Sequence, residues 1–350
     1  MKQRLFVIVT LIVGIAAVCC AERYYFVQRL LRPAPVTFPA TVQNVLVVNN
    51  AALPSPNTGH NIHIFNNRGK EIVPTDSVSV YCVWGMLESL NETGFFQSVG
   101  LIDASLHPYS ELYSTLWQLS QAKVDSLCQA YDVEALLVLN KISVKDSRTL
   151  QLESNDPLFG AKTYYSSLDV VTAAEWEIRY PKVSSAVNFT IRDTIFWEHE
   201  GSQEQVEAYM PQTQWALCSA AMACGMRAVT TLVPQWAEED RFLFDSKHLH
   251  QQGIGLVTHQ QWAQAIDSWQ PLVDHKKPLV RAYALADIAV CKEMMSDLPA
   301  ALQYASQALS TLEKLTSAEA LTAYDIIRLY ISQLKQIIAD ESRIKAQLAE

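Results

Sequence analysis

The pattern of apolar and polar residues divides the chain into a part with mixed strands and helices and a later part that is helical. Residues 42–48 are mostly apolar and β-branched, which predicts a buried strand. Helical spacing follows over residues 76–93, and a second strand is expected in 94–103. A second helix over 119–131 and a third strand over 133–146 complete the order. Alternating strands and helices of this kind favour a small α/β sheet.

Two later segments alternate between apolar and polar residues. In AEWEIRY, residues 174–180, Trp176 and Ile178 share one face and their sequence neighbours share the other. AVNFTIRDTIFWEHE, residues 186–200, alternates in the same way. A period of two predicts strands that are buried on one side and solvated on the other. We therefore expect an antiparallel hairpin added to the sheet.

After this hairpin the apolar period becomes that of a helix. Pro211 stands where a first helical turn can begin. Gly225 predicts a close contact with another helix, because glycine within a helix otherwise costs about 1 kcal/mol against alanine. From Ala237 onward the pattern predicts helices alone. The expected fold class is α+β, with a small mixed α/β sheet domain over residues 42–200 and an all-α helical domain over residues 201–350.

Two segments of the helical part resemble each other. QWAQAIDSWQPLV and DLPAALQYASQAL place equivalent alanines, Ala265 and Ala301, 36 residues apart. Tetratricopeptide repeats have a period of about 34 residues. We expect tetratricopeptide-like repeats over about residues 247–315, followed by a capping helix over 321–348; an ordinary helical bundle is the alternative. The residues expected to make the repeat contacts are Gly253, Leu256, Ala265, Trp269, Leu285, Ala289, Ala301 and Ala308.

The N-terminus combines a basic start, an apolar run and a polar exit. Lys2 and Arg4 precede residues 5–20, which are uncharged and mostly apolar. A bilayer core about 30 Å thick needs about 20 apolar residues. The run is therefore short for a membrane span and suits a signal peptide over residues 1–20.

The sequence is compatible with three ways of processing this signal. Lipidation of Cys20 is favoured because a small residue, Cys19, directly precedes it; Cys19 is the alternative lipid site. Ordinary cleavage after Ala21 and an uncleaved anchor are the other two. A lipid would hold the protein in a bacterial cell envelope, at the outer membrane or facing the periplasm, whereas ordinary cleavage would secrete it to the periplasm. Three prolines between positions 33 and 39 predict an extended tether over residues 21–41.

Composition and charge exclude one class of partner. Hydrophobic residues make up 49% of the chain, which allows a sizeable core. The net charge is −9, and the mature region has no cluster of lysines and arginines. Binding to a phosphate backbone needs a basic face, so we do not expect a nucleic-acid partner.

The cysteines predict neither a disulfide framework nor a zinc site. They are scattered and odd in number after the signal, and no CxxC occurs. Cys218 and Cys224 would lie about 9 Å apart along one helix, beyond the Cα separation of about 7 Å that a disulfide spans. We interpret the five as small buried apolar residues: Cys82, Cys128, Cys218, Cys224 and Cys291.

Familiar catalytic motifs are absent from the sequence. GxSxG, HExxH, Walker A and GxGxxG do not occur. Glu198 beside His199 could carry out acid–base chemistry, but neighbours in a strand point to opposite faces. We expect no catalytic residue, no metal and no cofactor. Two histidine pairs lack an evident third ligand: His60 with His63, and His248 with His250.

The eight tryptophans raise the question of a ligand platform. Trp117 and Trp236 lie near the ends of predicted elements, so they are the tryptophans expected at the surface and the candidates for ligand contact. The other six fit the apolar faces of helices or strands and are expected in the core: Trp84, Trp176, Trp197, Trp215, Trp262 and Trp269.

Several segments together resemble a family of Bacteroidetes envelope lipoproteins of unknown function. They are the lipoprotein-like signal, PVTFPATVQNVLVVNNA, ETGFFQSV, YDVEALLVLNKI, AEWEIRY with RDTIFWE, and the tetratricopeptide-like tail. This resemblance covers nearly the whole chain. The stretch from Val42 to about Glu200 also resembles, more weakly, the small domains of curli-secretion and penicillin-binding-protein-activator lipoproteins. Neither resemblance implies a catalytic residue.

These observations lead to one functional hypothesis and two alternatives. The hypothesis is a non-enzymatic envelope lipoprotein that binds a protein partner in the groove of its helical repeats and the membrane through an N-terminal lipid anchor. The first alternative is a receptor for a glycan or a peptide that uses Trp236 and the loop over residues 54–74. An exposed aromatic platform would favour the receptor. An enzyme is the second alternative, and it requires Glu198 and His199 to meet another acid in a deep pocket.

Overall fold

The chain folds into two units, one sheet-rich and one largely helical, and is therefore of the mixed α+β class. The sheet-rich unit contains Ala34–Pro234. The helical unit combines Met1–Pro33 with Gln235–Glu350. This computed structural model describes residues 23–53, 60–61, 72–73, 75–107, 116–155, 162–245 and 249–348.

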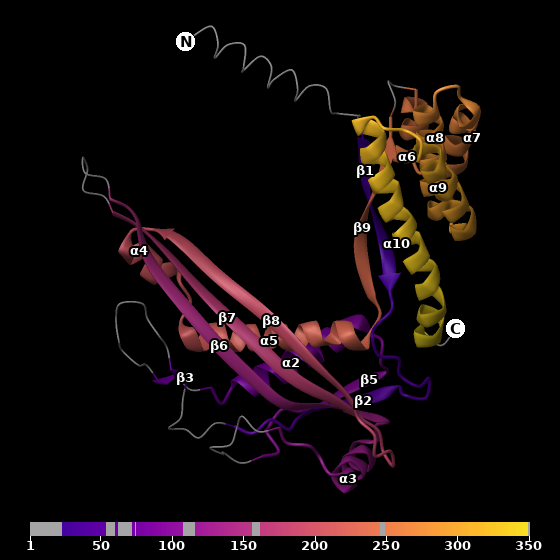
Figure 1. Ribbon diagram of the computed structural model, residues 1–350. Helices are drawn as coiled ribbons and strands as arrows, with labels where there is room; N and C mark the ends of the chain where they lie inside the picture. The colour runs from indigo at the N-terminus through magenta and orange to yellow at the C-terminus, as the bar shows by residue number, and fades with distance from the viewer. Residues whose placement is uncertain are drawn as a thin grey trace. The chain divides into compact units, whose positions relative to one another are not determined.

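Five strands form the sheet of the first unit (Figure 1): β2 (Asn44–Asn49), β5 (Ser98–Ile102), β6 (Ala135–Asn155), β7 (Lys162–Arg179) and β8 (Val187–Gly201). Their order is β5-β2-β6-β7-β8. β2 runs parallel to β5 and β6, whereas β6, β7 and β8 are antiparallel. The predicted strands and hairpin are confirmed, but β6 continues to Asn155 because its second half pairs with β7. A separate small ribbon pairs β3 (His60–Asn61) with β4 (Ile72–Val73).

Helices cover both faces of the sheet where its strands are parallel. On one face the apolar side chains of Val45 and Val47 join the core that contains two helices, and on the other Leu46 and Val48 pack with a third. Burial on both faces explains the apolar run at 42–48. The two helices of the first face are α2 (Val78–Thr93) and α5 (Thr213–Leu232), and the third is α3 (Gln121–Tyr131).

The two helices on the shared face approach each other closely. A Cβ atom on Gly225 of α5 would lie 1.9 Å from the carbonyl oxygen of Cys82 on α2. A Cβ atom on Gly85 of α2 would lie 2.0 Å from the carbonyl oxygen of Met222. The predicted close contact at Gly225 is confirmed, and Gly85 is its counterpart.

The segment after residue 201, where the helical period predicted one helix, contains two helices. α4 (Gln203–Tyr209) begins with a capping box between Ser202 and Gln205. Pro211 lies between α4 and α5 and begins neither. α4 packs against β7 and β8, so both helices belong to the sheet-rich unit. The predicted domain boundary at residue 201 is therefore wrong, because the apolar face of α5 completes the core over the sheet.

Among the described residues, α5 is the helix that is long and apolar enough to cross a membrane. Its apolar window has a mean hydropathy of 1.2, and 56% of that window is buried inside the protein. The side chains of Ala216, Leu217, Ala220 and Cys224 are part of the core over the sheet. The apolar composition of α5 is thus explained by its packing.

The helical unit begins with a strand ribbon. β1 (Arg23–Arg32) pairs antiparallel with β9 (Gln235–Phe244) along its whole length. Two predictions are corrected here. Residues 23–32 of the predicted tether form a strand, and 237–244 are not helical. Arg23–Arg32 and Gln235–Phe244 are distant in sequence, and the strand pairing that each needs comes from the other.

Helices fill the rest of this unit. They follow one another as α6 (Gln251–Thr258), α7 (Trp262–Trp269), the 3-10 helix η1 (Gln270–Asp274), α8 (Pro278–Met294), α9 (Leu298–Leu312) and α10 (Ala318–Leu348). α8 lies at the centre, in contact with α7, η1, α9 and β9. Every residue of α8 from position 282 to 291 is buried.

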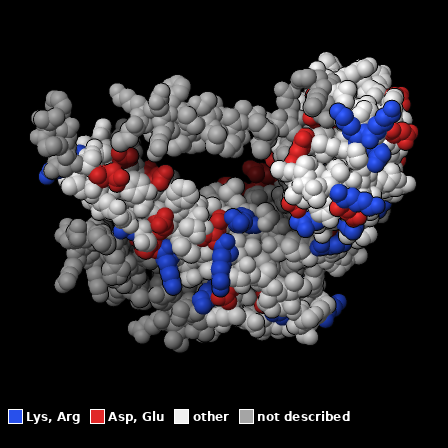
Figure 2. All heavy atoms as spheres, turned by 45° about the horizontal axis from the view of Figure 1, so that its top comes forward, with Lys and Arg blue, Asp and Glu red and all other residues white. Residues whose placement is uncertain are grey.

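Charged side chains of both signs are interspersed over the face of the molecule drawn in Figure 2. On that face lysines and arginines lie among aspartates and glutamates.

Candidate binding surface

The β1–β9 ribbon has one face against the helices of its unit and one face in solvent. Exposure alternates from Tyr24 to Leu30 in β1 and from Gln235 to Leu243 in β9. Directly paired residues share a face, so Val27 with Asp240, and Arg29 with Glu238, lie together on the solvent side. The pairs Phe26 with Arg241, and Gln28 with Glu239, lie together on the other side.

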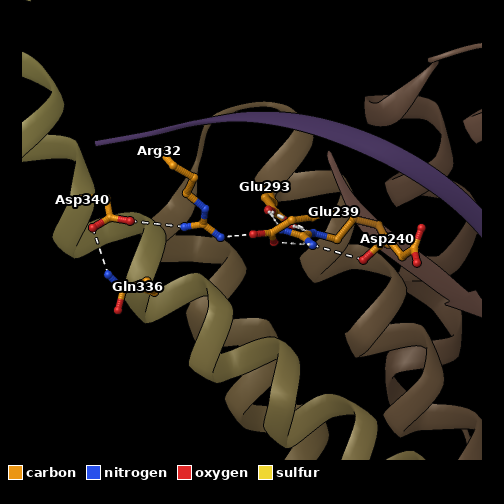
Figure 3. A network of polar contacts seen from close by, with 7 residues as sticks. Arg32, Glu239, Asp240, Glu293, Gln336 and Asp340 are labelled. Carbon is orange, nitrogen blue, oxygen red and sulfur yellow. Dashed lines mark hydrogen bonds and ion pairs between the residues drawn. The ribbon is translucent and has the colours of Figure 1, made fainter. Parts of the chain in front are cut away.

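An ion pair with negligible exposure fixes β9 to α8 (Figure 3). The Nε atom of Arg241 donates to Oε2 of Glu293 at 2.9 Å, and Nη2 donates to Oε1 at 2.8 Å. The Arg241 side chain is 0% exposed and that of Glu293 is 1% exposed. The hydroxyl of Tyr330 on α10 donates to Glu293 at 2.9 Å. Burial, together with the neighbouring Glu293 charge, raises the pKa of Tyr330 well above its usual value.

A second chain of ion pairs fixes the end of β1 to α10 (Figure 3). Arg32 binds Glu239 of β9 and donates from Nη1 to Oδ2 of Asp340 at 3.2 Å. Glu239 in turn accepts from Arg241 at 3.0 Å. Gln336 donates to the other oxygen of Asp340 at 2.9 Å. Because buried charges are tolerated only when they are paired and hydrogen-bonded, this network orients the inner face of the ribbon.

Aromatic rings and a buried histidine complete the inner side. Phe244 stacks on Tyr283 of α8 with ring centroids 4.4 Å apart. Asp287 of α8 accepts from the Phe244 amide at 2.8 Å and lies 2.8 Å from Nδ1 of His250. Burial raises the pKa of Asp287 from its usual 3.8 to about 6, although the hydrogen bond with His250 opposes the shift. Hydrogen bonds and apolar contacts with α8 thus both hold this end of β9 in place.

The outer face presents two kinds of groups to solvent. Trp236 is 70% exposed, Tyr25 57% and Val27 58%. Beside Trp236 the exposed side chains of Arg29 and Glu238 form an ion pair with an N–O distance of 3.0 Å. Trp236, Arg29 and Glu238 line a hollow of about 620 Å³. We call the five residues the ribbon surface.

The structure sorts the tryptophans differently from the sequence. Trp176 and Trp269 are buried as predicted. Trp84 and Trp215 are 46% and 59% exposed, so their predicted core positions are wrong. The Trp215 ring contacts that of Trp197 on β8 at 5.9 Å, and Trp84 donates to Asp103 after β5 at 3.3 Å, so both rings lie at the edge of the core. The ring of Trp117 is half-buried, with its centroid 5.0 Å from that of His107. Trp197 and Trp262 are partly buried.

The predicted repeat contacts lie inside the helical unit. A Cβ atom on Gly253 of α6 would lie 2.1 Å from Cε2 of the buried Trp269 ring on α7, so these helices touch at Gly253. Leu256 is half-buried. The other residues of the predicted set are buried: Ala265, Leu285, Ala289, Ala301 and Ala308.

The candidate chemical residues do not gather into a reactive site. Glu198 accepts a hydrogen bond from the Tyr165 hydroxyl at 2.9 Å, and the His199 ring packs on that of Tyr209 at 4.6 Å. No group of three metal-ligating side chains occurs among the described residues. Some predicted positions lie outside the described side chains: Cys19, Cys20, His60, His63 and His248.

Sequence reasoning selected Trp236 but missed the rest of the ribbon surface. Tyr25, Val27 and Arg29 lie in RYYFVQRLLR, where the alternation of the strand is interrupted by Leu30 and Leu31 and is adjacent to a proline-rich stretch. His250, interpreted together with His248, is fully buried against Asp287. The partner strand of RYYFVQRLLR is more than two hundred residues away, and no local signal points to it.

The two units thus define a protein with an α+β fold, an exposed aromatic surface and no recognised catalytic centre among its described residues. The chain belongs to the family of the domain of unknown function DUF8603, which matches residues 42–244. A second domain of unknown function, DUF6340, matches residues 251–336. The first match ends at the last residue of β9. No curated protein matches the chain.

Proposed function

We propose that this chain is a non-enzymatic cell-envelope lipoprotein that binds a polypeptide segment of a partner protein at the ribbon surface. The observation that carries the proposal is the exposed Trp236, next to the Arg29–Glu238 ion pair, on a ribbon whose inner side is fixed. Tryptophan, tyrosine and arginine are the residues that most often dominate the energy of protein interfaces. A fixed ribbon presents them with little loss of conformational entropy on binding.

The backbone of the ribbon favours a peptide over a glycan. β1 and β9 form a two-stranded sheet, and no other described strand pairs with either. An extended peptide could add to such an edge through main-chain hydrogen bonds, with alternate side chains meeting Trp236 or Val27. Arg29 and Glu238 present one positive and one negative charge, which would fix the register of the added peptide. A glycan would use the aromatic ring but not the strand edge.

In this proposal the predicted helical repeats support the ribbon and do not form an open groove. In tetratricopeptide-like arrangements the first helix of each repeat lines the groove, and α8 is that helix in the second copy. α8 is covered by β9 through Arg241–Glu293 and Phe244–Tyr283. Its residues 282–291 are buried. In this proposal the chain's own ribbon covers α8, the helix that was expected to line a groove for the partner.

The membrane attachment belongs to the same proposal. A lipid on Cys20, or alternatively on Cys19, would place β1 close to the membrane, because β1 begins at Arg23. Intact-mass analysis of the mature wild-type chain beside Cys20→Ala tests this attachment. An unmodified wild-type N-terminus would contradict it and leave secretion to the periplasm.

Site-specific photocrosslinking in native cells tests the partner. We would place a photoreactive amino acid at Trp236 in one full-length chain and at Trp215 in the other. Trp215 is a matched control, because it is 59% exposed but lies on α5 of the other unit. A dominant adduct with one protein at position 236, absent at 215, supports the proposal. Equal adducts at both positions, or none at 236, reject it.

A scaffold that acts through the surface of its helical repeats is the second candidate. It is supported by the 36-residue offset between Ala265 and Ala301 and by the contacts of α6 with α7 and of α8 with α9. A third crosslinking position at Leu329 of α10, which is 62% exposed, distinguishes it from the first. Deleting residues 247–350 would not distinguish the two candidates, because Glu293, Tyr330 and Asp340 hold the ribbon in place and would be removed as well.

A further inference from the structure

Two cysteines that are far apart in sequence meet between α2 and α5. Cys82 and Cys224 are both 0% exposed, and each thiol shifts the pKa of the other. The helices touch at this point, since a Cβ atom on Gly225 would lie 1.9 Å from the Cys82 carbonyl oxygen. Cys224 is the immediate neighbour of Gly225, about 3.8 Å away along the backbone. The close approach thus places Cys82 and Cys224 at the same contact between α2 and α5.

The surroundings make the two thiols chemically unequal. Hydrogen bonds from Cys82, the Thr172 side chain and the Ala174 backbone lower the pKa of Cys224, although burial opposes the shift. Burial raises the pKa of Cys82 well above its usual value, and its hydrogen bond with Cys224 adds to the rise. In the folded unit Cys224 therefore reaches the thiolate form more readily than Cys82.

We propose that Cys82 and Cys224 form a structural disulfide between α2 and α5 when the chain folds in the presence of a disulfide donor. During folding, the thiolate of one of the two cysteines attacks one sulfur of the donor, forms a mixed disulfide and releases one donor thiol. The thiol of the other cysteine loses its proton and attacks the protein sulfur of this mixed disulfide, which releases the second donor thiol. Two protein thiols and one donor disulfide become one protein disulfide and two donor thiols, and the donor takes up two electrons.

The remaining described cysteines lack such a partner. Cys218 lies six residues before Cys224 on α5, about 9 Å along the helix axis. Cys291 is in the other unit, and Cys128 is on α3 across the sheet. The bridge would close the segment that contains β5, β6, β7 and β8, and would join the two helices that cover one face of the sheet.

Burial determines how the bridge forms. Both sulfurs are inaccessible in the folded unit, so the donor reaches them during folding rather than afterwards. The inference does not depend on the ribbon surface or on the lipid, because it requires only a disulfide donor at the time of folding.

The test uses the full-length wild-type protein in two preparations. One is isolated from cells with its thiols blocked by an alkylating agent under denaturing conditions without reductant. The other is refolded from the reduced state with oxidised glutathione, and both are analysed by intact mass and peptide mapping. We expect a Cys82–Cys224 linked peptide in at least the refolded preparation, with an intact mass about 2 Da below that of the fully reduced chain. Linkage in the cellular preparation as well would show that the donor acts in vivo.

Matched variants identify the bridge. Cys218→Ser should leave the linked peptide and the loss of about 2 Da unchanged, whereas Cys82→Ser should abolish both and leave Cys224 fully alkylated. The wild-type measurement stands even if a variant does not fold. Free alkylation of both Cys82 and Cys224 in both wild-type preparations would overturn the proposal, and so would linkage of Cys224 to Cys218.

Discussion

Removal of the Glu293 carboxylate tests the buried network that holds the ribbon. In Glu293→Leu, the Arg241 guanidinium keeps its contacts with Glu239, a backbone oxygen and the Tyr330 ring, and the Tyr330 hydroxyl loses its acceptor. Breaking a buried pair by removing one partner costs about 3–5 kcal/mol, because the other charge stays buried after losing the partner that accepted most of its hydrogen bonds. The exposures of 0% and 1% for these two side chains place the pair in that range. We expect the free energy of unfolding of the helical unit to fall by about 3–5 kcal/mol.

The assay is urea unfolding of the full-length protein followed by far-UV circular dichroism. Asp325→Ala is the control, because its ion pair with Arg328 joins side chains that are 68% and 67% exposed and should contribute at most about 1 kcal/mol. A second variant, Glu293→Leu with Arg241→Leu, should lose less stability than Glu293→Leu alone, since no buried charge then lacks its partner. A loss below about 1 kcal/mol in the single variant, or a double variant no more stable than it, would refute the reasoning.

Three further predictions address packing, titration and the ribbon surface. Gly253→Ala should destabilise the helical unit, since its Cβ atom would lie 2.1 Å from the buried Trp269 ring. Gly255→Ala in the same helix is the control: its Cβ atom meets nothing within 4 Å, so it should stabilise the unit by about 0.5–1 kcal/mol. The urea midpoints of the two variants test this difference. The pKa of Asp287 is about 6 in the folded protein against the usual 3.8, so its carboxyl binds a proton more readily in the folded state than in the unfolded state. The contribution of Asp287 to the free energy of unfolding should therefore decrease as pH rises from 3.8 to about 6. Unfolding free energies measured across that range should show a steeper decrease in the wild type than in Asp287→Asn, and equal slopes would contradict the assignment. Trp236→Ala should leave the unfolding midpoint within about 0.5 kcal/mol of wild type because the ring is 70% exposed, and a larger loss would mean that Trp236 serves the fold rather than a partner.

The sequence predicted the sheet-rich unit better than the helical one. Its strands carry local signals, namely the apolar run at 42–48 and the alternation at 174–180 and 186–200. Burial on two faces produces the first pattern and burial on one face the second. The length of β6 could not be predicted in the same way, because its second half gains its pairing from β7.

The candidate surface was only partly predictable. Trp236 was selected because it lies near an element end, but the expectation of helix from Ala237 onward gave it the wrong surroundings. The segment QWAEEDRFLF contains glutamate, arginine and leucine, which are good helix formers. Pairing with β1 overrides that preference, since ten consecutive residues exchange backbone contacts with a partner strand.

The sequence by itself determined the alternation of strands and helices in residues 42–200 and the close helix contact at Gly225. These depend on periodicity and on backbone preferences, which act over a few neighbouring residues. Tertiary structure alone decided which distant segments meet: β1 with β9, Arg241 with Glu293, and Cys82 with Cys224. Such meetings follow from the burial of apolar faces against one another, a property of the whole folded chain that no short stretch of sequence contains.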